Sequence, residues 1–153
     1  MPTVLLIANQ TLAAGVVESF VRSRLDSGPP AEFTLVVPAT VQGHGPLERA
    51  VGLFGHAGTV RPSLIAVDAG YEQARGRLEF GLDRLRRLGA AVDGDVGVAD
   101  AFKAISEVLT RRRFDEVVLF TLPRGVSRWL HLDIPHHVER KFHVPVTVIT
   151  AGQ

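Results

Sequence analysis

The chain contains no cysteine among its 153 residues, which excludes disulfides, thiol catalysis and thiolate metal ligands. The two signs of charge are nearly balanced, with 17 basic residues, 16 acidic residues and a net charge of +1. This balance gives no electrostatic reason to expect nucleic acid or an anionic membrane as a partner. Long apolar runs are also missing, and the first residues, MPTVLLIANQ, lack the basic segment of a secretory signal. We therefore expect a cytoplasmic protein.

What the sequence does contain is the composition of a globular domain, with 46% hydrophobic and 22% charged residues. The length suits a single domain that spans residues 1–153. Uninterrupted β-prone runs predict strands at 4–8, 33–37, 116–121 and 146–150, and a more polar strand at 90–98 is predicted at a sheet edge. Strands that are apolar on both faces are typical of a parallel sheet covered by helices on both sides.

Helical spacing of apolar residues separates these strands. It predicts helices at 12–25, at 63–88 and, after a cap at Asp100, at 101–112. A further helix, capped by Ser127 or Asp133, ends before Pro145. Residues 39–62 are glycine-rich and are predicted to form an irregular excursion with a short helix near 47–53. Alternating strands and helices predict right-handed crossovers and a ligand site at the carboxyl ends of the strands.

Three segments together resemble the universal stress protein family. They are VADAFKAI at 98–105, FDEVVLF at 114–120 and VERKFHVPVTVIT at 138–150. The resemblance implies an α/β fold of three layers, with an open five-stranded parallel sheet of order 3-2-1-4-5 and helices on both faces. It also implies ATP or another adenine nucleotide as the ligand, and a homodimer. The final strand, at 146–150, is the edge that we expect to pair with a second copy.

The nucleotide loop of the family, Gly-x-x-Gly-x9-Gly-Ser/Thr, is not conserved in its pattern here. Aligned back from Pro145, its three glycines and its hydroxyl residue fall on Leu119, Leu122, Leu132 and Asp133. Glycines let successive N–H groups approach a phosphate, whereas Pro123 removes one such donor. Asp133 at a helix N-terminus is expected to satisfy the free N–H groups itself and to repel an anion. The acidic residue usual after the first strand is Asn9, so the sequence predicts a rebuilt site.

We predict that the ligand site uses residues from three strand ends and from the loop after the fourth strand. Arg124 and Arg128 would supply positive charge, and Gly125 and Ser127 would supply backbone or hydroxyl contacts. Asn9 would form a polar floor. The complete predicted set is Ala8, Asn9, Gln10, Pro38, Thr121, Arg124, Gly125, Ser127 and Arg128.

The histidines at 131, 136, 137 and 143 could suggest a metal site, but His136 and His137 face the cations Arg140 and Lys141 at i+4. We interpret them as surface residues and expect no metal.

Three functions remain open from the sequence. The first is a non-catalytic, stress-linked binding or regulatory module for a nucleotide or another small anion. The second is a protein–protein interaction module that has lost nucleotide binding. The third is a small hydrolase with Ser127 as nucleophile, for which Asp133 and His143 lie too close in sequence to form the usual triad.

Overall fold

The computed structural model describes residues 2–39, 62–123 and 128–151. The excursion predicted at 39–62, with its short helix near 47–53, lies outside these residues except for its two ends. Five parallel strands form one sheet in the order β3-β2-β1-β4-β5. Their bounds are Thr3–Ile7 (β1), Glu32–Pro38 (β2), Ala91–Gly97 (β3), Glu116–Thr121 (β4) and Val146–Thr150 (β5). The predicted fold class and strand order are confirmed.

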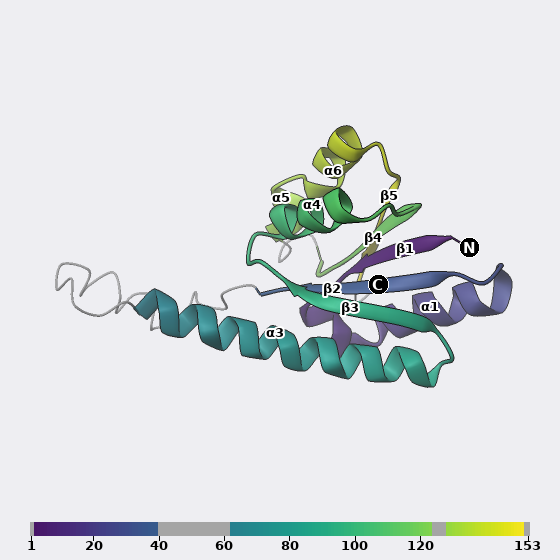
Figure 1. Cartoon of the computed structure of the whole chain (residues 1–153), viewed down its shortest axis with the longest axis horizontal. Coiled ribbons are helices and arrows are strands. Elements are labelled where there is room, and N and C mark those ends of the chain that lie inside the picture. The colour runs from purple at the N-terminus through teal and green to yellow at the C-terminus, as the bar shows by residue number, and fades with distance from the viewer. Residues whose placement is uncertain (1, 40–61, 124–127, 152–153) are drawn as a thin grey trace.

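Helices cover both faces of the sheet, as the apolar strands predicted (Figure 1). The helices are α1 (Val16–Ser27), α3 (Pro62–Arg87), α4 (Ala101–Arg111), α5 (Arg128–His131) and α6 (Ile134–Phe142). Residues alternate along β1, so that Val4 and Leu6 pack toward α1 and α3, while Leu5 and Ile7 pack toward α4 and α6. All four are at most 1% exposed. Full burial of such a side chain stabilises the fold by about 1.5–3 kcal/mol.

The two sheet edges differ in polarity. Strand β3 alternates exposed and half-buried residues, with Asp93 and Asp95 among the exposed ones, which confirms the predicted polar edge. Strand β5 forms the other edge, carries no charged residue, and leaves Val148 37% exposed. Only β3 therefore carries the charged side chains that protect an edge from pairing.

Two helix starts differ from the predictions. The helix predicted at 12–25 is instead a short 3-10 helix, η1 (Gln10–Ala14), followed by α1. Gly15 separates them at φ 75°, a conformation that glycine adopts without strain. The Asp100 cap is confirmed, since its Oδ1 accepts from Lys103 N at 3.0 Å. The Asp133 cap is wrong: its backbone is left-handed, and its carboxylate contacts His136 Nδ1 at 2.7 Å instead of a backbone N–H.

Helix α3 is longer than the strands that it covers. Its 26 residues span about 39 Å, whereas the 7 residues of β3 span about 23 Å. In Figure 1 the beginning of α3 extends past the carboxyl ends of β2 and β3. Within the described parts of the chain, no helix has the length and apolar composition needed to cross a membrane.

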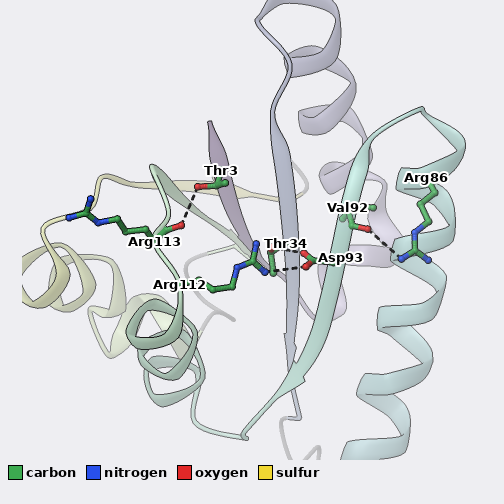
Figure 2. Close-up of polar contacts among 7 residues, drawn as sticks. All are labelled: Thr3, Thr34, Arg86, Val92, Asp93, Arg112 and Arg113. Atoms are coloured by element: carbon green, nitrogen blue, oxygen red, sulfur yellow. Dashed lines mark hydrogen bonds and ion pairs between the residues drawn. The ribbon is translucent and has the colours of Figure 1, made fainter. Parts of the chain in front are cut away.

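Polar contacts connect the elements in the amino-terminal half of the sheet (Figure 2). Thr34 Oγ1 donates to Asp93 Oδ1 at 2.6 Å, and Arg112 Nη1 donates to Asp93 Oδ2 at 3.1 Å. At the start of β1, Thr3 Oγ1 donates to the Arg113 carbonyl at 3.2 Å. Arg86 Nη2 also approaches the Val92 carbonyl, at 3.4 Å. The positive charge of Arg112 is therefore paired with the Asp93 carboxylate, and hydrogen bonds connect the elements at this end of the sheet.

Candidate functional site at the carboxyl ends of the strands

The central strands β1 and β4 form the switch point of the sheet, because the chain proceeds from β1 to one side and later returns on the other. Ile7 pairs with Leu119, so Asn9 and Thr121, each two residues further on, lie at the same level. A side chain joins the two ends, since Thr11 Oγ1 donates to the Phe120 carbonyl at 3.3 Å. We define the carboxyl-end site as residues 8–11, 38, 77 and 121. Ligands of open α/β sheets bind beyond such strand ends.

Asn9 is the polar centre of the carboxyl-end site. It lies two residues after the end of β1, directly precedes η1, and is only 6% exposed. Its Nδ2 donates to the Pro38 carbonyl at the end of β2 at 2.7 Å, and its Oδ1 accepts from Arg77 Nη1 of α3. A carboxylate could accept from the arginine but could not donate to the carbonyl. The amide therefore suits both of these neighbours, and it lies at the sheet end where we predicted a polar floor.

Arg77 brings a positive charge to this site. It lies in α3, is half-buried, and reaches Asn9 across 68 positions of sequence. Burial lowers the pKa of the Arg77 guanidinium, because a charged group loses water contacts there. The group nevertheless stays charged at neutral pH, because an arginine guanidinium is not deprotonated in proteins. The described floor thus combines a cation and an amide.

The other described residues of the predicted set are placed as follows. Ala8 and Pro38 are buried at the ends of β1 and β2, and Ala8 N donates to the Val36 carbonyl at 3.2 Å. Gln10 is exposed at the start of η1. Thr121 is 2% exposed, and its Oγ1 lies 3.5 Å from Thr150 Oγ1 in β5. The structure therefore brings Ala8, Asn9 and Pro38 together, while the Thr121 hydroxyl contacts β5.

The loop residues of the predicted set fall largely outside the described chain. Arg124, Gly125 and Ser127 lie outside it entirely. Arg128 is the first residue of α5, and its side chain is also outside the described part. These four residues remain predictions.

The acid–base pair considered for a hydrolase is not formed. The Asp133 carboxylate contacts His136, whereas His143 is exposed and begins the connection to β5. His136 and His137 are exposed as well, in agreement with their interpretation as surface residues. In the described residues, no three His, Asp or Glu side chains are grouped so that they could hold a metal ion.

Arg77 was not among the predicted site residues, although its spacing contained a signal. It lies three residues after Ala74 and four before Gly81, and both of these are buried. An arginine at those offsets falls on the apolar stripe of its helix, where it must contact the sheet or a ligand.

By sequence, the chain matches no protein-family model and no curated protein. By structure, it is similar to a universal stress protein in complex with cAMP, with 18% identity, a TM-score of 0.59, and 99% of this chain and 98% of the other aligned. A universal stress family protein from Burkholderia pseudomallei aligns over 96% and 94%, with 16% identity and a TM-score of 0.58. One from Arabidopsis thaliana with AMP bound aligns over 99% and 93%, with 15% identity and a TM-score of 0.57. The chain therefore has the fold of universal stress proteins over nearly its full length.

Proposed function

We propose that this chain is a divergent universal stress protein that acts as a non-catalytic binding or regulatory module. Its ligand would be an adenine nucleotide or another small anion, held at the carboxyl-end site. The observation that carries the proposal is the floor of this site, where Arg77 and Asn9 present a cation and an amide at the switch point. Among the described residues of the site there is no carboxylate that would repel an anion.

Two kinds of observation support the ligand class. Solved structures with this fold hold cAMP and AMP, whose common parts are adenine, ribose and a phosphate. In this chain the phosphate would find positive charge at Arg77 and, in our sequence-based prediction, at Arg124 and Arg128. Gly125 and Ser127 would add backbone and hydroxyl contacts. The missing glycines indicate that binding does not copy the family's loop.

Native mass spectrometry of the purified chain, followed by calorimetric titration with ATP, ADP, AMP and cAMP, tests this proposal. We expect a retained nucleotide or a saturable heat with at least one of the four. If the purified chain carries no ligand and all four titrations are silent, nucleotide binding is refuted. The interaction-module hypothesis then gains support, because the fold would serve a partner instead of a ligand.

We also propose that the protein is a homodimer that pairs through β5. This strand is a sheet edge made of Val, Thr and Ile, and Val148 is exposed on it. The β3 edge, in contrast, carries the exposed Asp93 and Asp95. An uncharged edge can add a strand from a second copy at little electrostatic cost, and symmetry makes such a pair self-complementary.

A further inference from the structure

The guanidinium of Arg77 differs from the other described arginines in its surroundings. Only Arg24 and Arg77 are half-buried among them, and the others are exposed. Arg24 Nη2 lies 2.8 Å and 2.9 Å from the two carboxylate oxygens of Glu116. Arg77 donates to the neutral amide of Asn9, and no carboxylate of the described residues forms an ion pair with it. Buried charges are usually paired, so a half-buried cation without a carboxylate can accept an anion from outside the chain.

The position of this charge fits a ligand-facing role. Asn9 follows β1 and Pro38 ends β2, so the group that contacts Asn9 lies at the carboxyl ends of these strands. Helix α3 continues past these ends in Figure 1. At the opposite end of the sheet, Figure 2 shows Arg112 reaching the carboxylate of Asp93. Among the described residues, Arg112 at the amino end of the sheet is therefore paired with a carboxylate, whereas Arg77, where ligands of this fold class bind, is not.

We propose that Arg77 binds the anionic group of the ligand directly, on the β1–β2 side of the carboxyl-end site. The chemical class is a phosphate ester or another compact oxyanion. The identity of the rest of the ligand rests on the proposed function. The negative charge of the ligand and the place where that charge binds are inferred from Arg77 alone. A guanidinium has five N–H donors, of which the contact with Asn9 uses one. The remaining donors can form the bidentate pair that arginine makes with phosphate.

The inference places the anionic group beside β1, where the resemblance implied an acidic residue. The family's nucleotide loop follows the fourth strand, and its glycines are missing here. Asn9 in place of an acid removes a negative charge, and Arg77 adds a positive one at the same point. Together these two residues create an electrostatic preference for an anion on the β1–β2 side of the carboxyl-end site.

Calorimetric titration of the full chain with AMP, adenosine and inorganic pyrophosphate tests the inference. Arg77→Gln removes the charge, Arg77→Lys keeps it without the planar fork, and Arg75→Gln is the matched control. Arg75 is exposed on the same helix and contacts Glu79 at 3.4 Å. We expect Arg77→Gln to weaken AMP and pyrophosphate by about 10- to 100-fold and adenosine by less than about 2-fold. Arg77→Lys should recover part of the loss, and Arg75→Gln should match the parent.

A second measurement does not depend on the stability of Arg77→Gln. The Nε–Hε resonance of Arg77 in a ¹⁵N-labelled chain can be assigned by its disappearance in the folded Arg77→Lys protein. We expect it to shift on addition of pyrophosphate, while the Arg75 resonance stays in place. This readout reports contact in the unmodified protein, so it decides the question even if Arg77→Gln does not fold.

The outcomes separate this inference from the proposed function. If AMP binds and Arg77→Gln binds it equally well, the proposed function stands and the role of Arg77 is refuted. Equal losses for AMP and adenosine would show that Arg77 is only structural. If pyrophosphate binds through Arg77 but no adenine compound binds, the inference stands and the adenine ligand is refuted. Silence with every probe and an unmoved Arg77 resonance would overturn both.

Discussion

Replacement of Asn9 by alanine should destabilise the fold measurably, because the side chain connects three elements in a buried place. The change removes the 2.7 Å donation from Nδ2 to the Pro38 carbonyl and the acceptor for Arg77. A buried carbonyl that loses its donor costs about 1–3 kcal/mol. The Arg77 guanidinium is partly exposed, so water can replace part of the hydrogen bond that it loses. We assign about 1 kcal/mol to the loss of that bond. The expected loss in unfolding free energy is therefore about 2–4 kcal/mol.

Urea denaturation, followed by far-UV circular dichroism and by the fluorescence of the single tryptophan, measures this loss. Trp129 packs against the core beneath α4 and α6, so its emission reports that side of the sheet. For a chain of this size, 2–4 kcal/mol corresponds to a decrease of about 4–16 °C in melting temperature. Gln10→Ala is the control, since Gln10 is exposed next to Asn9 and its replacement should cost less than about 0.5 kcal/mol.

A double-mutant cycle with Asn9→Ala and Arg77→Gln divides the loss between the two contacts. The coupling energy reports the Asn9–Arg77 bond, and we expect about 0.5–1 kcal/mol. The rest belongs to the Pro38 carbonyl and to packing around Asn9. If Asn9→Ala is as stable as Gln10→Ala and shows no coupling to Arg77, the Asn9 amide does not hold the three elements together. The geometric reasoning for the site would then be refuted.

Two further predictions concern the sheet. Gly94→Ala would place a Cβ 2.5 Å from the Leu35 carbonyl oxygen, which is backbone and cannot rotate away, so we expect a loss of about 1–3 kcal/mol in urea denaturation. The control is Gly76→Ala in α3, where nothing lies within 4 Å of the added Cβ, and this variant should gain up to about 1 kcal/mol in unfolding free energy. If the two variants were equally stable, the packing argument would be contradicted. If β5 forms the dimer interface, sedimentation velocity should find a dimer that Val148→Lys dissociates and Val98→Lys, beside the opposite edge, does not. A monomeric parent, or dissociation by both variants, would refute that interface.

The fold could be predicted because each strand carries its own signal. The residues of β1 are apolar on both faces, so both faces must be covered by other elements at any position in the sheet. The order of strands came from a resemblance spread over three segments, and the structure confirms it. Helix boundaries were less accurate. Leu12 and Val17 fit one helical repeat, and only the φ of Gly15 shows that the 3-10 turn and the helix are separate.

The site could be predicted only in part, because its contacts join positions that are remote in sequence. The carboxyl ends of the strands follow from topology, and the structure places Ala8, Asn9 and Pro38 there, while their role in binding stays a prediction. The apolar stripe of α3 singles out Arg77, but its contact with Asn9 depends on the register between the helix and β1, which no local pattern encodes. Asp133 failed as a cap for a related reason. Its backbone is left-handed, and its carboxylate contacts His136 and forms no cap hydrogen bond with the helix.

The stability of the fold and the charge of the candidate site depend on the same pair of residues. An aspartate at position 9 would neutralise Arg77 and place an oxygen without a proton against the Pro38 carbonyl. Asparagine avoids that repulsion and accepts a hydrogen bond from the guanidinium, whose charge then has no carboxylate partner among the described residues. The residue that departs from the family's acid is thus the one that the local geometry requires. The lost glycine pattern after β4 therefore does not contradict our proposal that an anion binds, since Arg77 supplies a positive charge beside β1.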